Sequence, residues 1–215
     1  MTGCSLTKHI LSLFDFSVVW SQPYADAGYR VERVDIQTGV DVLDLDPAAY
    51  EARYGPVHGI LAAPPCTHFA VSGARWWAEK DKDGRTQESL ELIDAVIEII
   101  HTLRPAWWAL ENPVGRLTRL RPQLGEPWFF QPWWCGDPYS KKTGLWGNFN
   151  RDLPRNNVKP IMHKNKGGKQ GSWQWAKLGG NPPRISRALR ERSGALRLRS
   201  QTPGGFAQAF FTANP

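Results

Sequence analysis

Short apolar runs that end at polar or reactive residues constrain the fold of this chain most strongly. Runs with the alternation or the continuous apolarity of strands occupy residues 11–16, 29–35, 58–63 and 107–110. Helices are expected between them, a short one at residues 24–28 and a longer one at 87–103, where apolar side chains recur at helical spacing. This alternation of strands and helices predicts an α/β fold built on a parallel sheet.

The ends of these runs carry the side chains that could do chemistry. Asp15, Asp35, Cys66 and the pair Glu111-Asn112 each lie at or just beyond the carboxyl end of a predicted strand. Ligands of open parallel sheets bind beyond the carboxyl ends of the strands, because the connecting loops converge there. We therefore expect these residues to share one site, although they come from four separate segments.

Two of these residues are candidates for covalent or acid–base catalysis. Cys66 follows Pro64 and Pro65, whose fixed φ makes a rigid turn, and a thiolate held there could attack a carbon electrophile. On position alone, a buried structural thiol is an equal alternative. Glu111 follows an apolar run, so desolvation should raise its pKa and help it to share a proton. Capping a helix or pairing with Arg116 is the alternative role for Glu111.

Positive charge is concentrated in one segment of the 215-residue chain. The net charge is +7, yet residues 151–199 alone hold 13 Lys and Arg against Asp152 and Glu191, a balance of +11. The rest of the chain has 14 basic and 18 acidic side chains, a balance of −4. Such a basic segment predicts a surface for a polyanion such as nucleic acid, or else a solvated lobe. Its Gly, Asn and Pro residues indicate a loop-rich insertion.

Other features argue against several classes of protein. No apolar run approaches the roughly 20 residues of a membrane span, and the first one is short and broken by Asp15, unlike a signal peptide. The three cysteines are odd in number and form no CxxC pair, which argues against a disulfide framework or a zinc site. We expect a soluble cytoplasmic protein without a metal, in which Cys4 and Cys135 are small buried side chains.

Several motifs taken together resemble the DNA cytosine-5 methyltransferases. Pro64-Pro65-Cys66, followed 45 positions after the cysteine by Glu111-Asn112-Pro113, is similar to the nucleophile loop and the Glu-Asn pair of that family. More narrowly, the chain resembles the short, phage-type members of the family. Three segments carry this resemblance: Pro-Pro-Cys-Thr-His-Phe, Trp-Ala-Leu-Glu-Asn-Pro-Val-Gly-Arg-Leu and Lys-Lys-Thr-Gly-Leu-Trp-Gly. The resemblance covers about residues 10–147 and 200–214.

The resemblance implies a Rossmann-like fold that binds S-adenosylmethionine. Residues 1–150 would form the catalytic domain, 151–199 a small DNA-recognition lobe, and 200–215 a segment that packs back on the catalytic domain. Residues at family positions that contact the cofactor are Phe14, Asp15, Phe16, Ser17, Asp35, Ile36, Asp41, Pro64, Leu92 and Phe206. Two segments depart from the family pattern: Ser17-Val18-Val19 lacks the usual glycines, and Gly136 to Thr143 has Tyr and Lys at the usual Gln and Arg positions.

The implied reaction is methylation of cytosine at C5. Cys66 would add to C6 of a base flipped out of duplex DNA, and Glu111 would hydrogen-bond N3 and the exocyclic amine. Residues expected to contact the base or the DNA are Pro65, Thr67, Ser72, Asn112, Arg116, Lys141 and Lys142, the last three as contacts to phosphate. Double-stranded DNA is the implied partner of a solitary phage enzyme that masks DNA from restriction, and no obligatory protein partner is evident.

Three alternatives remain open on the sequence alone. The same catalytic parts would serve an RNA cytosine-5 methyltransferase, and an inactive DNA-binding relative would account for the missing glycines. The donor could also carry a group other than methyl.

The tryptophans fall into two sets. Four of them are expected in the core, namely Trp76, Trp77, Trp133 and Trp134. For Trp173 and Trp175, in the basic segment, stacking on bases and packing in the core are equally expected.

Overall fold

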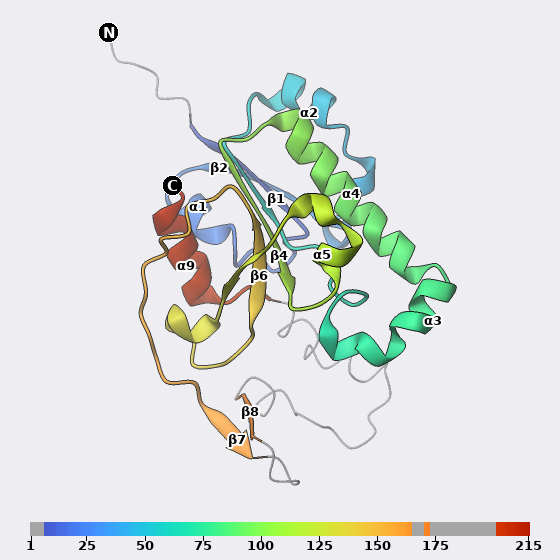
Figure 1. The fold of residues 1–215 in the computed structure, drawn as a ribbon. Coiled ribbons are helices and arrows are strands. Elements are labelled where there is room, and N and C mark those ends of the chain that lie inside the picture. Colours follow the sequence, from blue (N-terminus) through green and yellow to red (C-terminus); the bar gives the residue numbers. More distant parts are fainter. Residues whose placement is uncertain (1–6, 165–169, 173–200) are drawn as a thin grey trace.

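A six-stranded mixed sheet forms the centre of the molecule (Figure 1). In the computed structural model, which describes residues 7–164, 170–172 and 201–215, the strand order is β2-β1-β3-β4-β6-β5. Four strands are parallel, β1 (His9–Leu13), β2 (Arg30–Val34), β3 (Gly59–Ala62) and β4 (Trp107–Pro113). The predicted α/β fold is therefore confirmed.

The sheet is mixed, because its remaining two strands are antiparallel to their neighbours. The prediction of a purely parallel sheet was therefore wrong for this part. β6 (Thr143–Gly147) pairs antiparallel with both β4 and β5 (Trp128–Phe130). The connection from β5 to β6 contains no α-helix to carry the chain across the sheet, which favours antiparallel pairing. A separate antiparallel pair is formed by β7 (Met162–Lys164) and β8 (Gln170–Ser172).

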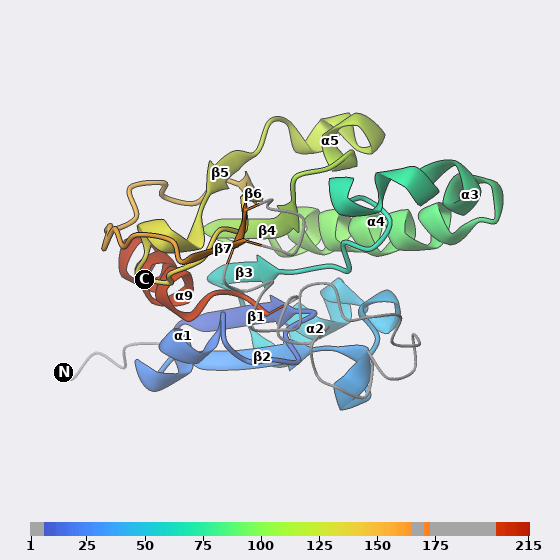
Figure 2. The same cartoon turned by 90° about the horizontal axis from the view of Figure 1, so that it is seen from below.

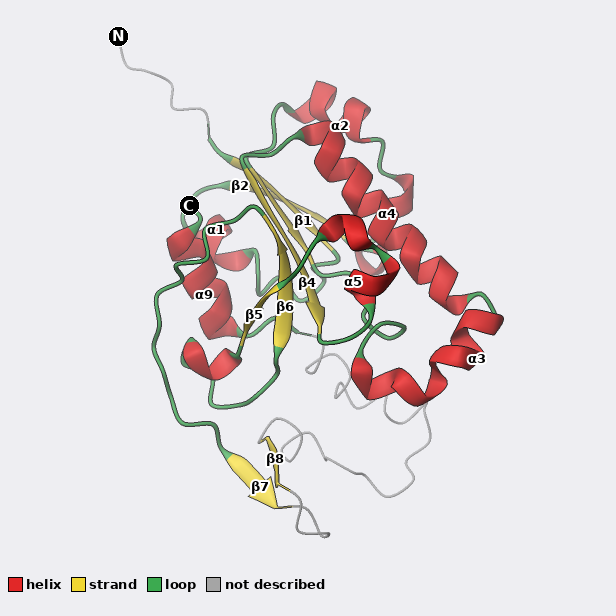
Figure 3. Cartoon of the chain, in the orientation of Figure 1, coloured by secondary structure: helices red, strands yellow, loops and turns green. Residues whose placement is uncertain are grey.

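Helices cover both faces of the sheet (Figures 1 and 3). One face packs against α2 (Pro47–Tyr54) and α4 (Arg85–Leu103), and the other against α1 (Gln22–Asp26) and α9 (Gly204–Ala213). Successive residues of a strand point to opposite faces of the sheet. Leu11 and Ile60 therefore lie in the core between the sheet and α4, and Ile10 and Leu61 lie in the core between the sheet and α9 (the α9 core). Shorter elements are η1 (Ile36–Thr38), η2 (Val42–Asp44), η3 (Val71–Trp76), α3 (Trp77–Lys82), α5 (Leu117–Leu120), η4 (Pro122–Leu124) and η5 (Pro132–Trp134).

No helix was expected between the predicted strands at residues 29–35 and 58–63, where α2 forms. This helix begins with Asp46, whose Oδ1 accepts hydrogen bonds from the backbone N–H groups of Ala48 (2.9 Å) and Ala49 (3.0 Å), and Pro47 follows at its first position. An acidic N-cap before proline is a strong local start signal. The helix is only eight residues long, so its hydrophobic periodicity is too brief to stand out.

The order of the strands creates a topological switch point between β1 and β3. The chain passes from β1 to β2 on one side and then to β3 on the other, and Figure 2 shows β2, β1 and β3 side by side. Loops at the carboxyl ends of strands diverge at such a point and leave a crevice for a ligand. This doubly wound arrangement is the Rossmann-like fold expected from the sequence.

The segment before the C-terminus packs on the sheet through α9. Phe206 and Phe210 are fully buried, and Phe206 stacks on Phe130 with ring centroids 3.9 Å apart. The division at residues 150 and 199 stays a prediction, because Cys4, Trp173, Trp175 and most of the basic segment lie outside the described residues. Among the residues that are described, no helix combines the length and apolarity needed to cross a membrane.

Gly205 at the start of α9 is predicted to tolerate no side chain. A Cβ there would lie 2.0 Å from the carbonyl oxygen of Cys135 and 2.8 Å from Asp137 Oδ2, which accepts the Gly205 N–H at 2.9 Å. Gly205→Ala should lower the free energy of unfolding by about 1–3 kcal/mol, measured by urea titration. The control is Gly204→Ala, where a Cβ meets nothing within 4 Å and helix propensity should add roughly 0.5–1 kcal/mol. Equal effects of the two changes would contradict the proposed tight contact.

Candidate active site

The loops that follow β1, β2 and β3 line a cavity of about 440 Å³ at the switch point. Leu92 of α4 completes one wall, and Gln201 and Thr202, just before α9, complete another. The volume is within the range of sites for small organic ligands. Segments far apart in the sequence thus meet at one edge of the sheet.

Most of the residues expected at a cofactor lie around this cavity. Those that line it are Phe14, Asp15, Phe16, Ser17, Asp35, Ile36, Asp41 and Leu92. Pro64 and Phe206 do not line it. Pro64 is buried and its carbonyl accepts a hydrogen bond from Asn112 Nδ2 at 3.3 Å. Phe206 belongs to the α9 core, since its spacing to Phe210 turns both rings toward the sheet.

Asp35 is held rigidly at the end of β2. Its Oδ2 accepts the backbone N–H of Phe16 (3.2 Å) and its Oδ1 accepts that of Gln37 (2.8 Å). One carboxylate therefore joins the loop after β1 to the turn after β2. Each carboxylate oxygen has a further lone pair, so Asp35 can still accept hydrogen bonds from a ligand's hydroxyl groups.

The loop after β1 adopts left-handed backbone without glycine. Phe14 has φ 61° and Val18 has φ 57°, a region that costs a non-glycine residue of the order of 1–2 kcal/mol. Backbone hydrogen bonds hold it, from Phe14 N to the Val34 oxygen (2.7 Å) and from Val18 N to the Asp15 oxygen (3.2 Å). The missing glycines are therefore compensated by fixed contacts. The Asp15 carboxyl accepts the Ser12 hydroxyl at 2.9 Å, and burial raises its pKa.

Glu111 lies close enough to Cys66 to influence the ionisation of the thiol. Cys66 is half-buried in the cavity wall, and its pKa is raised first by burial and then by the charge of Glu111. Glu111 is buried in β4, and burial raises its pKa as well. Lys141 Nζ lies 3.8 Å from Glu111 Oε1 and opposes both shifts.

Arg116 and Lys141 are buried or partly buried, unlike the phosphate contacts expected of them, whereas Lys142 is exposed. Arg116 is only 4% exposed and forms a two-pronged ion pair with Asp81, so its guanidinium cannot reach phosphate. Lys141 lies beside Glu111, and its side chain is mostly buried. Lys142 is exposed, with its ammonium 4.3 Å from the ring centre of Phe129.

The other residues expected at the base or the DNA fall into two groups. Pro65 and Thr67 are exposed and line the cavity beside Cys66. Ser72 is exposed on η3, away from the cavity lining. Asn112 is fully buried and ties β4 to the turn before Cys66, and its Oδ1 has no partner within the described residues. Asn112 therefore supports the turn.

Several cavity residues were missed by sequence reasoning. They are Trp20, Gln37, Val42 and Ala63. Gln201 and Thr202 also line the cavity, and they belong to the segment 200–215, which was expected to pack back on the catalytic domain. Gln37 and Ala63 adjoin expected residues, so a wider window would have included them. Trp20 carries no local signal, because a tryptophan facing a cavity has the same pattern as one in a core. Trp76, expected in the core, is 47% exposed on the surface of η3. Clusters of acidic, histidine and cysteine side chains that could hold a metal do not occur in the described part of the chain.

Among known proteins, the chain has a distant structural likeness and no sequence match. No protein-family model matches the chain, and no curated protein matches it. A solved structure from E. coli is similar with a TM-score of 0.49 and 16% identity, over 84% of this chain and 57% of that one. That protein is named as a DNA modification methyltransferase encoded within a prophage, an activity that its description marks as unproven. This chain spans just over half its length, and so distant a likeness assigns no activity.

Alkylation of Cys66 by iodoacetamide should report the charges around it. The thiolate fraction rises about tenfold per pH unit below the thiol pKa. Because Glu111 raises the pKa of Cys66 and Lys141 lowers it, Glu111→Gln should speed alkylation at about pH 8 and Lys141→Met should slow it, each several-fold. Peptide mass spectrometry across a pH series measures the rates. Lys142→Met is the control. Slower alkylation in Glu111→Gln, faster alkylation in Lys141→Met, or the same shift in both would contradict the arrangement.

Proposed function

We propose that this protein is an S-adenosylmethionine-dependent DNA cytosine-5 methyltransferase of the short, phage type. The main support is that Cys66 lies in the wall of the cavity, while the buried carboxyl of Glu111, on the neighbouring parallel strand, is near enough to raise the pKa of that thiol. An electrophilic base ring needs both groups, one to attack carbon and one to hold a proton on a ring nitrogen.

The residues of the cavity suit S-adenosylmethionine. Asp35 would accept hydrogen bonds from the ribose hydroxyls, and Asp41, in the same lining, from the adenine amino group. Phe14, Phe16 and Leu92 would provide apolar contact to the ring and the side chain. When bound there, the cofactor would supply an electrophilic methyl group at the end of the cavity where Cys66 lies.

Cys66 would activate the target base. Its thiolate sulfur forms a bond to C6 of cytosine. The electrons of the C5–C6 double bond then form a double bond between C4 and C5, and those of the N3–C4 double bond pass to N3, which gains a proton. The C5 carbon can then take up a methyl group. Loss of the C5 proton to solvent, breaking of the S–C6 bond and return of the N3 proton to Glu111 restore the aromatic ring and release Cys66 as the thiolate. The base has to leave the duplex to reach a cysteine in this position.

Glu111 and Lys141 would control the protons. Burial raises the pKa of Glu111, so its carboxyl can carry the proton that N3 receives. Lys141, 3.8 Å away, limits that shift and also favours the Cys66 thiolate. The basic segment at residues 151–199 supports a polyanionic substrate, and duplex DNA is the one we propose.

Transfer of label from methyl-labelled S-adenosylmethionine to duplex DNA tests the proposal. Cys66→Ser should lose on the order of 10³-fold or more in rate because it removes the nucleophile. Glu111→Gln should lose about 10²–10⁴-fold through loss of proton transfer. Cys135→Ala, at a buried cysteine of the α9 core, is the matched control and should stay active.

Three outcomes would contradict the proposal in different ways. Full activity of Cys66→Ser would remove the nucleophile assignment. Labelling of transfer RNA but not of duplex DNA would favour an RNA methyltransferase. A wild-type protein that binds DNA but not S-adenosylmethionine would be an inactive relative. The mass of the product nucleoside would also show whether the transferred group is methyl.

A further inference from the structure

Each backbone carbonyl from Cys66 to Ala70, in the loop that carries the cysteine, accepts a hydrogen bond. The Cys66 oxygen accepts the N–H groups of Phe69 (3.0 Å) and Ala70 (2.9 Å), the Phe69 oxygen accepts that of Arg116 (3.0 Å), and the Ala70 oxygen accepts that of Gly73 (3.0 Å). A surface loop usually leaves such carbonyls to water. Hydrogen bonds at consecutive residues therefore indicate a loop with one set conformation.

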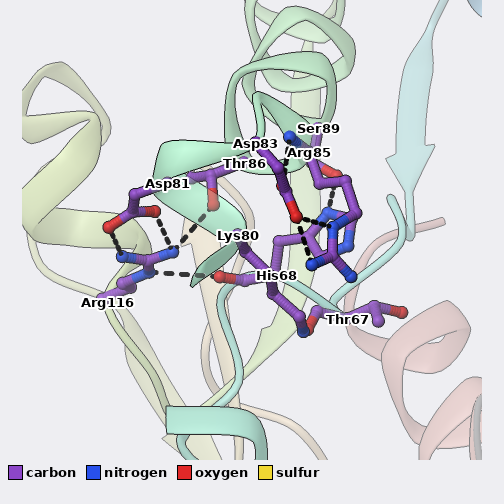
Figure 4. Close-up of polar contacts among 9 residues, drawn as sticks. All are labelled: Thr67, His68, Lys80, Asp81, Asp83, Arg85, Thr86, Ser89 and Arg116. Carbon is purple, nitrogen blue, oxygen red and sulfur yellow. Dashed lines mark hydrogen bonds and ion pairs between the residues drawn. The ribbon is translucent and has the colours of Figure 1, made fainter. Parts of the chain in front are cut away.

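The two carbonyls between these receive charged side chains (Figure 4). Lys80 Nζ donates to the Thr67 oxygen at 2.6 Å, and Arg116 Nε donates to the His68 oxygen at 3.1 Å. Hydrogen bonds from charged donors are shorter and stronger than those between neutral groups. Lys80 is only 7% exposed although it belongs to α3, whose other lysine, Lys82, is exposed.

Arg116 joins the loop to two helices. Its Nη1 and Nη2 each bond one oxygen of Asp81 on α3 at 2.7 Å, and Nη2 also donates to Thr86 Oγ1 on α4 at 2.9 Å. The guanidinium lies 4.7 Å from the ring centre of Trp77. Arg116 holds the pKa of Asp81 down at about 2, so this ion pair stays intact at any pH at which the protein would work.

Two further contacts fix the loop from other sides. His68 Nδ1 lies 2.5 Å from the Ser89 hydroxyl of α4 (Figure 4). Ala70 forms a backbone bridge with Gly115, where a Cβ would lie 2.0 Å from the Phe69 oxygen. The cysteine loop and the segment after β4 are therefore in direct backbone contact, and only glycine fits between them.

From these contacts we infer that Lys80 and the Arg116–Asp81 pair are positioning residues that hold the Cys66 loop in its working conformation before any substrate binds. None of the three lines the cavity, so they act through the backbone of Thr67 and His68. The consequence for catalysis rests on the proposed function, while the set conformation of the loop does not. A thiol displaced by about 1 Å can lose on the order of 10²-fold in rate.

Amide hydrogen exchange, followed by mass spectrometry, tests the loop without any substrate. Lys80→Met removes the donor but keeps most of the stem, and exchange at residues 66–71 should rise about tenfold or more. Lys80→Arg, which can still donate, should restore most of the protection. Asp81→Asn, at an exposed carboxylate whose loss should not unfold the protein, should also raise exchange. Lys82→Met on the same helix is the matched control and should change nothing.

Kinetics of the same variants test the effect on catalysis. Lys80→Met should lower kcat roughly 10- to 100-fold and leave KM for DNA and for S-adenosylmethionine within about twofold. Unchanged exchange in both Lys80→Met and Asp81→Asn would overturn the inference. A raised KM with unchanged kcat would overturn it too, because Lys80 would then contact DNA. If the wild-type protein transfers no methyl group, the proposed function fails, and the exchange results alone decide whether these residues hold the loop.

Discussion

The parallel pairing of β3 with β4 is the constraint on which the rest of the site depends. The register sets Gly59 opposite Trp107 and Ala62 opposite Leu110, so the turn to Cys66 leaves β3 beside Glu111. Gly59 is needed for this pairing, because a Cβ there would lie 2.3 Å from the Trp107 ring. A shift of one residue would turn Glu111 to the opposite face of the sheet and separate the two groups.

Burial at this strand edge has opposite effects on reactivity. It raises the pKa of Glu111, which helps that carboxyl to hold a proton, and it also raises the pKa of Cys66, which keeps the free thiol protonated and unreactive. Lys141 offsets part of both shifts from a segment between η5 and β6. The thiol is thus protected from general reaction with solvent electrophiles, while the loop around it already has a defined backbone.

The local parts of this structure could be predicted from the sequence, and the long-range contacts could not. Periodicity placed β1 to β4 and α4, and the rule on carboxyl strand ends placed Asp35 and Cys66 at one edge. β6 was missed because its residues, Thr143–Gly147, give no alternation that separates a strand from a loop. Arg116 was expected at phosphate, because a charged residue after a turn looks like a surface residue until its partner Asp81, 35 positions earlier, is known. Lys80 had no signal at all.

Trapping with DNA that contains 5-fluorocytosine tests the central claim most directly. Fluorine at C5 cannot leave as the proton does, so the bond between sulfur and C6 should persist after methyl transfer. The account predicts a covalent protein–DNA complex that survives denaturation, requires S-adenosylmethionine, and maps to Cys66 by peptide mass spectrometry. Absence of the complex with an otherwise active protein, or attachment at any other residue, would contradict it.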